Sequence, residues 1–290
     1  MVYKFRHILG TFNFNQKFEI TEEKGTEELP KEGIPRVLTN FRDKKYFKEL
    51  YDKNVEITKQ KIKESVTEDG FIINAISNIN ELDRATNTLI KRLREWFALY
   101  LPEYEHLMNN QEVFVQSVIN KHKTELMKEL GIEETMGADL EEIHVQEIQL
   151  LAKRISSLQL LRKEHEDYLE KIMKEYCPNI LELAGTTIGA KLLELAKSLK
   201  RLAMLPASTI QLLGAEKALF RHIKTGSKSP KYGVIFAHQL IQGSKRSVRG
   251  KAARILADKL SICARLDYFK GEFKGKLYRE ELEEKLGCKK

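Results

Sequence analysis

Apolar and polar side chains alternate over residues 2 to 20, and breakers stand at Gly10 and at Asn15 and Gln16. A period of two is typical of a half-buried strand, so the pattern predicts a β-hairpin or two short strands. Residues 22 to 35 contain Gly, Pro and charge without periodicity and predict a loop. Helical spacing returns over residues 40 to 64. The apolar positions of the alternating segment are Tyr3, Phe5, Phe12, Phe14, Phe18 and Ile20.

Two later segments carry apolar residues at alternating steps of three and four, the spacing of a heptad seam. The first seam runs from Ile72 to Tyr100 and ends before Pro102; the second runs from Ile148 to Tyr176 and ends before Pro178. Residues 102 to 140, between them, show only broken helical pieces. We therefore expect an antiparallel coiled-coil hairpin, with a two-helix edge of a larger bundle as the alternative.

An isolated helix pair of this length leaves apolar surface over, so we expect the coiled coil to form a homodimer. Arg162 and His165 interrupt the second seam and would set its register. The positions assigned to the dimerisation seam are Leu89, Leu93, Trp96, Ile148, Leu151, Ile155, Leu158 and Leu169.

After Pro178 the apolar density rises again, and Gly185, Gly189, Pro206 and Gly214 divide short helices. Residues 250 to 267 predict a longer, Ala-rich helix. The predicted fold is mostly α: a small α+β N-terminal module, a long antiparallel coiled coil and an all-α C-terminal domain. The expected boundaries are residues 1–64 for the module, 65–176 for the coiled-coil region, 177–270 for the C-terminal domain and 271–290 for a charged, frayed tail.

Composition limits the class of protein. Charged residues make up 32% of the chain, and no apolar run approaches the roughly 18 residues that cross a bilayer. The N-terminus lacks the apolar core of a signal peptide, so we expect an intracellular, cytoplasmic protein. Cys177, Cys263 and Cys288 lie far apart and form no CxxC spacing. A zinc site or a disulfide framework is therefore not expected.

Positive charge is concentrated in one block. Residues 217 to 257 contain ten Lys or Arg and no Asp or Glu, whereas the whole chain has a net charge of only +8. The rest of the chain is therefore slightly acidic, and the block indicates a local polyanionic partner, most simply RNA. The ten residues are Lys217, Arg221, Lys224, Lys228, Lys231, Lys245, Arg246, Arg249, Lys251 and Arg254.

Several strings in this region resemble one family. LPAST at 205–209, GAEKALFRH at 214–222, PKYG at 230–233 and RGKAAR at 249–254 occur in the order found in the Nop domain of box C/D ribonucleoprotein core proteins. RLREWFALYLPE at 92–103 and MGADL at 136–140 resemble the coiled-coil segment of the same family. The likeness spans about residues 41 to 269. The sequence resembles the archaeal members more than the eukaryotic ones, because it lacks the Lys/Glu-rich C-terminal tail of the eukaryotic members.

The resemblance implies a function. Such domains bind a kink-turn RNA after a small kink-turn-binding protein has docked, and the N-terminal domain binds the methyltransferase fibrillarin. The expected partners are thus fibrillarin, the kink-turn protein and a box C/D guide RNA. S-adenosylmethionine belongs to fibrillarin, so no cofactor or catalytic site is expected here, and a eukaryotic member would be nucleolar. The expected RNA or RNP contacts are Gly214, Ala215, Glu216, Lys217, Arg221, Lys224, Lys228, Lys231, Tyr232, Arg246, Arg249, Lys251 and Arg254.

Three alternatives stay open. The chain is otherwise a spliceosomal-type RNP protein without a methyltransferase, an RNA-acting enzyme that uses His222 or His238, or a DNA-binding coiled-coil regulator. GTTIGAKL at 185–192 has the glycine spacing of a phosphate loop less one residue, and Leu192 replaces the magnesium-binding hydroxyl, so a helical turn is expected. Neither histidine has an acid or nucleophile at a recognised spacing.

Overall fold

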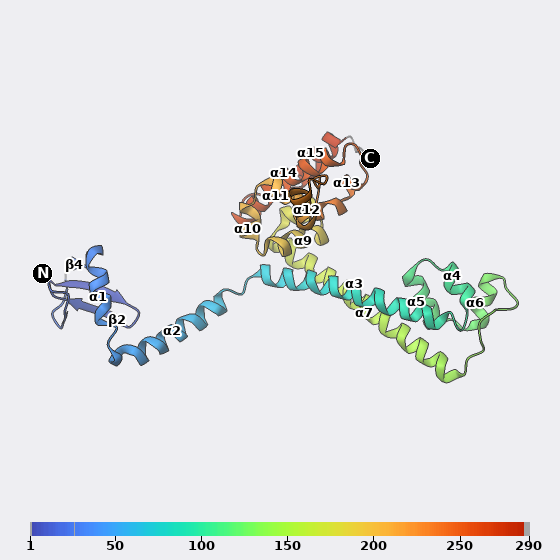
Figure 1. Ribbon diagram of the computed structural model, residues 1–290, viewed down its shortest axis with the longest axis horizontal. Helices are drawn as coiled ribbons and strands as arrows, with labels where there is room; N and C mark the ends of the chain where they lie inside the picture. The colour runs from blue at the N-terminus through green and yellow to red at the C-terminus, as the bar shows by residue number, and fades with distance from the viewer. Residues whose placement is uncertain (1, 26, 287–290) are drawn as a thin grey trace. The chain divides into compact units, whose positions relative to one another are not determined.

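The computed structural model describes residues 2–25 and 27–286 (Figure 1). Its backbone contacts divide the chain into two units, residues 1–67 and residues 68–290. The first unit holds a small sheet with three helical segments, and the second holds the coiled coil and the C-terminal helical domain.

The predicted hairpin is present in the first unit. Strand β1 (Tyr3–His7) pairs antiparallel with β2 (Gly10–Phe14), and Tyr3 stands opposite Phe14. Two further strands, β3 (Ile20–Thr21) and β4 (Glu27–Glu28), complete the sheet in the order β3-β2-β1-β4. The expectation of a loop over residues 22 to 35 was partly wrong, because β4 pairs parallel with β1, a long-range contact that local spacing does not report.

The aromatic residues of the hairpin form the core of this unit. Phe14 and Phe41 are buried with Val37 of α1 (Ile34–Asn40), which follows the short helix η1 (Lys31–Gly33). The ring of His7 stacks on Phe41 at 4.0 Å between centroids. Burial lowers the pKa of His7, which favours the neutral ring in this stack.

Helix α2 (Lys44–Glu64) begins at Asp43, whose carboxylate accepts a hydrogen bond from the backbone N–H of Lys45. It has no buried residue. Phe47, Tyr51 and Ile62 stand exposed along one side of it, where an apolar stripe of a helix ordinarily packs against a core.

The coiled-coil prediction is confirmed in the second unit. Helices α3 (Glu68–Phe97) and α7 (Glu142–Tyr176) pack along their length, with the start of α3 beside the end of α7 (Figure 1). Arg162 donates to Asp83 across the pair at 2.5 Å and forms an ion pair with Glu166 at 2.9 Å. Arg162 therefore joins the two helices within one chain, whereas His165, the other polar position, lies against the Leu161 carbonyl of its own helix.

Three short helices cover the far end of the coiled coil: α4 (Pro102–Leu107), α5 (Gln111–Asn120) and α6 (Lys123–Leu130). They bury Tyr104 and Phe114 against Phe97. Arg94 holds the group together, because its guanidinium donates to the Glu105 carboxylate at 2.8 Å and to the Met108 carbonyl at 2.6 Å.

Several residues assigned to the dimer seam lie elsewhere. Leu93, Ile148, Ile155 and Leu169 are buried within the single chain. Leu89, Leu151 and Leu158 are half-buried, and Trp96 is 50% exposed because Phe97 occupies the inward position. The heptad pattern identified the residues that join α3 to α7, which is an intramolecular seam. Of the eight seam residues only Trp96 is exposed, so a second chain would have to contact it or surface outside the seam.

The C-terminal domain wraps short helices around α14 (Arg249–Tyr268), an Ala-rich helix as predicted. The apolar side of α14 buries Ala253, Leu256, Leu260 and Ala264. The surrounding elements are α8 (Pro178–Ala184), α9 (Thr186–Ala196), α10 (Leu199–Met204), α11 (Ala207–Leu212), α12 (Glu216–Thr225), η2 (Val234–Ala237) and α13 (Gln239–Gln242).

The expectation of a frayed tail after Gly271 was wrong for the described residues. Helix α15 (Gly275–Leu286) packs on α8 and α14 and buries Leu282. Lys259 of α14 forms an ion pair with Glu281 of α15. One apolar side of α15 packs on these helices, and its charged side chains face solvent. The average polarity of the segment does not reveal this amphipathic pattern. Cys288, the third cysteine, lies outside the described residues; Cys177 and Cys263 are buried free thiols.

One apolar core runs from the coiled coil into the C-terminal domain. It includes Ile72 of α3, Leu169 of α7 and Leu256 of α14. Polar contacts strengthen the join: Asp69 accepts a hydrogen bond from the Leu199 N–H at 2.9 Å, and Ser77 donates to Glu194 at 3.0 Å. The predicted fold class, mostly α with a small α+β module, a coiled coil and an all-α C-terminal domain, is confirmed.

Asp267 provides a test of this packing. Its carboxylate is buried in α14 and accepts hydrogen bonds from the N–H groups of Asn179 and Ile180, at 3.1 and 2.9 Å, at the start of α8. Burial raises the pKa of Asp267, while these hydrogen bonds favour its ionised form.

We expect Asp267→Ala to lower the free energy of unfolding of the second unit by about 1–3 kcal/mol, because two buried N–H groups lose their acceptor. Chemical denaturation followed by circular dichroism would measure the change. Asp258→Ala, on the exposed side of the same helix, is the matched control and should change stability by less than about 0.5 kcal/mol. Equal effects of the two substitutions would contradict the pinning role of Asp267.

Candidate nucleic-acid interface

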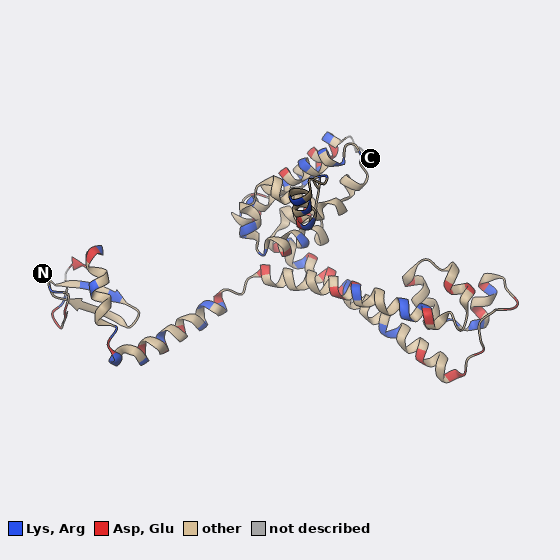
Figure 2. Ribbon diagram, in the orientation of Figure 1, with Lys and Arg blue, Asp and Glu red and all other residues tan. Residues whose placement is uncertain are grey.

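The ten cations of the basic block are not neutralised by acids in the described part of the chain. Nine of them are exposed and Arg249 is half-buried. None of the ten has a carboxylate within 4.0 Å among the described residues, whereas cations elsewhere pair, as Lys121 does with Glu129 at 2.5 Å. Figure 2 shows several blue segments on α12, where Glu216 at the start of the helix is the one acidic residue. The like charges of this surface repel one another and attract a polyanion.

Helix α12 carries the first part of the block. Lys217, Arg221 and Lys224 follow each other at the spacing i, i+4, i+7 and therefore share one face. None of its residues is buried. Beside the cations, Phe220 is 61% exposed and Ile223 is 69% exposed. The helix thus offers charge and apolar surface together.

The turn before α12 holds the GAEK string in place. Gly214 has a φ of +85°, a conformation that favours glycine. Its N–H donates to the Glu216 carboxylate at 2.8 Å. Glu216, which the resemblance placed among the contacts, therefore stabilises the turn from which α12 projects. Ala215 is half-buried and precedes the first residue of the helix.

The PKYG loop is fixed to the end of α11. The Gly233 N–H donates to the Gln211 carbonyl at 2.8 Å, and the Gln211 side chain donates to the Lys231 carbonyl at 2.6 Å. A Cβ on Gly233 would lie 1.9 Å from the Leu213 carbonyl oxygen, so only glycine fits. These contacts fix the backbone that carries Lys231.

The same loop meets the start of α14. A Cβ built on Gly250 would lie 3.5 Å from Cδ of Lys231, which places the lysine stem beside the first turn of the helix. Lys251 and Arg254 project from that helix and are exposed. Lys228 is exposed on the loop, and Lys245 and Arg246 are exposed on the segment that precedes α14. The loop and the helix start, two of the three expected elements, therefore converge.

Tyr232 and Arg249 support this surface from below. Tyr232 stacks on Phe236 at 4.6 Å with 10° between the ring planes and packs against the main core. The Arg249 guanidinium lies 5.7 Å from the centroid of Phe236 and donates to the carbonyls of Gln242 and Ser244, each at 3.1 Å. Both residues were expected to contact RNA. In the structure, the ring contact of Tyr232 and the hydrogen bonds of Arg249 position the loop and the start of the helix.

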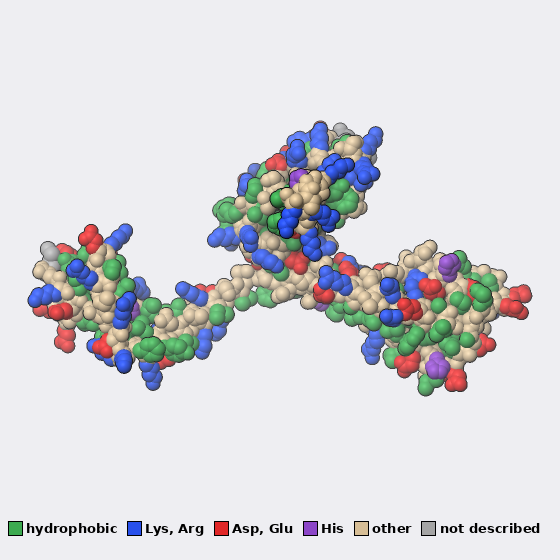
Figure 3. Space-filling view, viewed as in Figure 1, with side chains coloured by type: hydrophobic (Ala, Val, Ile, Leu, Met, Phe, Trp, Pro, Cys, Tyr) green, Lys and Arg blue, Asp and Glu red, His purple; other side chains and the backbone are tan. Residues whose placement is uncertain are grey.

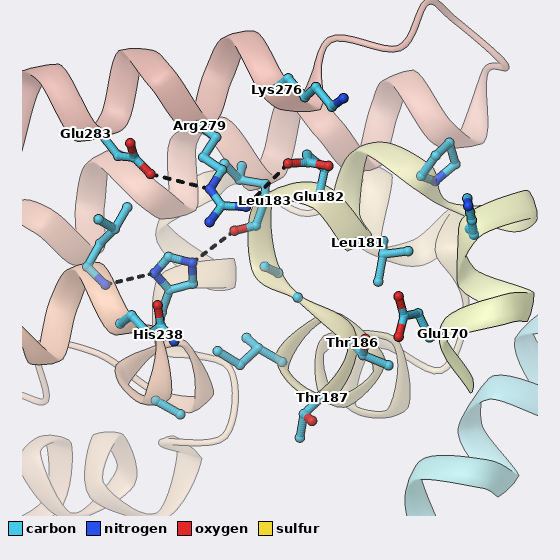
Figure 4. Close-up of a pocket in the computed structure, with 18 of the residues that line it drawn as sticks. Glu170, Leu181, Glu182, Leu183, Thr186, Thr187, His238, Lys276, Arg279 and Glu283 are labelled. Carbon is cyan, nitrogen blue, oxygen red and sulfur yellow. Dashed lines mark hydrogen bonds and ion pairs between the residues drawn. The ribbon is translucent and has the colours of Figure 1, made fainter. Parts of the chain in front are cut away.

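The histidines considered for catalysis are bound to backbone groups. Nε2 of His238 donates to the Leu183 carbonyl at 2.9 Å, and Nδ1 accepts from the Leu240 N–H at 3.3 Å (Figure 4). Burial lowers the pKa of His238, which keeps this donor and acceptor pattern. Nδ1 of His222 lies against the Ser227 carbonyl. Each ring stabilises a turn, which argues against the enzyme alternative.

A groove of about 880 Å³ lies beside His238, between α8, α9 and α15. Arg279 crosses it and pairs with Glu182 at 3.3 Å and with Glu283 at 3.4 Å (Figure 4). The GTTIGAKL string forms the start of α9 at one edge. Gly189 faces Met173 and Ile180 there, where a Cβ would come within 2.8 and 3.0 Å. This glycine therefore serves helix packing.

No three His, Cys, Asp or Glu side chains in the described part of the chain gather closely enough to hold a metal ion. No helix among the described residues is long and apolar enough to span a membrane.

Comparisons with known proteins give the context for this surface. A family model for Nop, described as "snoRNA binding domain, fibrillarin", matches residues 78–287. A NOP5 family protein of Methanocaldococcus jannaschii is 40% identical over 96% of this chain and 67% of its own length. Human nucleolar protein 56 is 34% identical over 75% of this chain, which spans only 41% of that relative.

A solved structure is similar as well. The structure titled as a fibrillarin/Nop5p complex contains a chain with a TM-score of 0.51 and 25% identity to this one, over 94% of this chain and 98% of that chain. The aligned region therefore includes both units of the chain.

Proposed function

The chain belongs to the Nop family, and from this we propose that it is a non-catalytic scaffold of a box C/D guide ribonucleoprotein. It would hold fibrillarin at one end and kink-turn RNA, with its small kink-turn-binding protein, at the other. The observation that carries the proposal is the set of ten cations without a carboxylate partner among the described residues, which lie on α12, on the loop that follows it and on the segment that leads into α14. The methyl donor S-adenosylmethionine would be bound by fibrillarin, and this chain would need no cofactor.

The composition of α12 supports recognition of RNA and protein together. RNA alone would require cations, and Lys217, Arg221 and Lys224 supply them. The exposed Phe220 and Ile223 on the same helix are instead suited to a protein surface. A kink-turn RNA that already carries its protein presents both kinds of surface. Figure 3 shows the mixture of hydrophobic and basic side chains on this domain.

The first unit supports the fibrillarin end. Its hairpin aromatics are mostly core, so the contact would be made by other residues. Phe47 and Tyr51 are exposed on α2, and a pair of exposed aromatic residues one helical turn apart is typical of a protein contact.

The coiled coil supports a role as a spacer and a dimer interface. The helix pair is joined to the RNA-binding domain by a continuous core. It would therefore fix the distance between that domain and the far end of the coiled coil, which a flexible linker would not. Trp96 and Leu99 near the end of α3, and Ile143 near the start of α7, are exposed and available to a second copy. The archaeal relative is consistent with a cytoplasmic particle, and the nucleolar relatives with a nucleolar place in eukaryotes.

The RNA end is tested by Lys217→Gln, Arg221→Gln and Lys224→Gln in one protein. We expect it to bind the complex of a kink-turn RNA and its protein at least about tenfold more weakly at 0.1 M KCl. For about five phosphate contacts the log–log salt slope of the original chain is about −4 to −5, and it should become shallower by about three. Electrophoretic mobility shifts at several salt concentrations measure both quantities.

The matched control changes Lys91, Lys153 and Lys163 to Gln, three exposed lysines of the coiled coil. It should bind like the original chain. We call Lys217, Phe220, Arg221, Ile223 and Lys224 the α12 surface. If the two triple variants bind equally well, the α12 surface is not the RNA contact. Reconstitution with fibrillarin, scored by site-specific 2′-O-methylation, then tests the complete scaffold.

The fibrillarin end is tested by Phe47→Glu with Tyr51→Glu. We expect fibrillarin retention on the immobilised chain to fall at least about tenfold, because two charges would enter an apolar contact. Kink-turn RNP binding should be unchanged. Lys59→Glu, on the polar side of α2, is the control. Full retention by the double variant would exclude this face of α2.

The dimer is tested by light scattering after size-exclusion chromatography. The original chain should elute with twice its monomer mass at micromolar concentration, and Trp96→Glu with Leu99→Glu should elute as a monomer. Thr88→Glu, also exposed on α3, should stay dimeric. A monomeric original chain would remove the homodimer from the proposal.

A further inference from the structure

A second cationic surface lies on the C-terminal domain, away from the basic block. Residues 195 to 215 contain Lys197, Lys200 and Arg201 and no Asp or Glu. Lys270 follows the end of α14. Two exposed apolar side chains stand among these cations: Met204, 59% exposed, and Phe269, 66% exposed. We call these six residues the α10 face.

Hydrogen bonds bring the two segments of the α10 face together. The Arg265 side chain donates to the Ala203 carbonyl at 3.2 Å, and Ser261 donates to the Leu205 carbonyl at 3.5 Å. Residue numbers rise along α14 as they fall along α10, so the helices run antiparallel. The start of α10 therefore lies beside the end of α14, where the orange-red end of that helix meets α10 in Figure 1.

The four cations of the α10 face have no internal countercharge. None of them has a carboxylate within 4.0 Å among the described residues. The neighbouring acids are engaged elsewhere: Asp267 accepts from the start of α8, Glu272 pairs with Lys274 at 3.1 Å, and Asp69 accepts from the Leu199 backbone. Like the basic block, this surface is suited to an external polyanion.

Backbone conformation gives independent support. Lys197 has a φ of +72° and Lys270 a φ of +53°. Each ends a helix, at a position where glycine is strongly favoured because it has no Cβ. Phe18 is the only other described non-glycine residue in this region of φ. Lysine at both positions costs stability that glycine would restore, and unfavourable residues of this kind cluster at functional sites.

The apolar members indicate the form of the polyanion. The ring of Phe269 is held by Tyr268, at 4.9 Å between centroids with 71° between the planes, and is otherwise largely exposed. An exposed aromatic ring among lysines is the arrangement on which unpaired bases stack while cations neutralise the backbone. A duplex would bury its bases and leave Phe269 without a partner.

We propose that the α10 face binds a single-stranded segment of RNA. It lies at the opposite end of α14 from Arg254: the eleven residues from Arg254 to Arg265 alone span about 16 Å of helix. The contact is thus separate from the cations at the start of α14 and does not depend on a kink-turn protein. One domain would hold a structured RNA at one end of α14 and an unpaired strand at the other.

The test uses the full chain and a fluorescein-labelled 15-nucleotide oligoadenylate, with affinity measured by fluorescence anisotropy at several KCl concentrations. Lys217→Gln, Arg221→Gln and Lys224→Gln serve as the background, so that the α12 surface does not mask the effect. In this background, Lys197→Gly with Lys270→Gly should weaken oligoadenylate binding at least about fivefold. The log–log salt slope should become shallower by about 1.4, because each phosphate contact with a single strand contributes about 0.7 to the slope. Phe269→Ala should weaken binding about tenfold.

The glycine substitutions exclude misfolding as the cause, because they relieve the backbone at both positions. The double glycine variant should unfold at the same temperature as its parent or a higher one. Lys91→Gln with Lys163→Gln, in the same background, is the charge-matched control and should leave oligoadenylate binding within twofold.

Two results would overturn the proposal. The first is oligoadenylate binding within twofold of the parent in both the double glycine variant and Phe269→Ala, which would also be the outcome if the face bound a protein. The second is equal weakening by the control. Assembly with kink-turn RNA, measured separately in the otherwise original chain, should be unchanged by the glycine pair, so failure here leaves the proposed scaffold function intact.

Discussion

A continuous apolar core joins the coiled coil to the C-terminal domain, and the geometry of the second unit depends on it. Ile72 and Leu169, from the two long helices, share this core with Leu256 and Leu260 of α14. Burial of such side chains contributes about 1.5–3 kcal/mol each, which a surface ion pair does not approach. Side-chain packing therefore sets the angle between the coiled coil of α3 and α7 and the RNA-binding domain.

Polar contacts then fix details that apolar packing leaves free. Asp69 accepts from the start of α10, and Asp267 accepts from the start of α8. Both carboxylates occupy helix N-termini, where unpaired N–H groups and the helix dipole favour negative charge. Asp69 of α3 and Asp267 of α14 are thus engaged within the structure and do not neutralise the exposed cations of the domain.

The arrangement of charge explains how one domain can present two binding surfaces. The α12 surface combines cations with Phe220 and Ile223, whereas the α10 face combines cations with Phe269 and Met204. The first turn of α14 meets the PKYG loop and its last turns meet α10, so this one helix positions both the loop and the α10 face. Lys197 and Lys270 have positive φ on the α10 face, and the PKYG loop has a position that only glycine fits.

The sequence alone determined the hairpin, the two long helices, the Ala-rich helix and the acid-free basic block, because period-two spacing, heptad spacing and charge counts are local properties. It also carried the family, through short ordered strings. Only the tertiary structure decided which neighbour each apolar side meets: Phe97 turns inward in place of Trp96, the seam residues pack within one chain, and α15 docks on α8. It also decided that Tyr232 and Arg249 support the surface, and that Lys197 and Lys270 lie on one face. Contacts between residues distant in sequence depend on the whole packed chain, and spacing along one segment does not specify them.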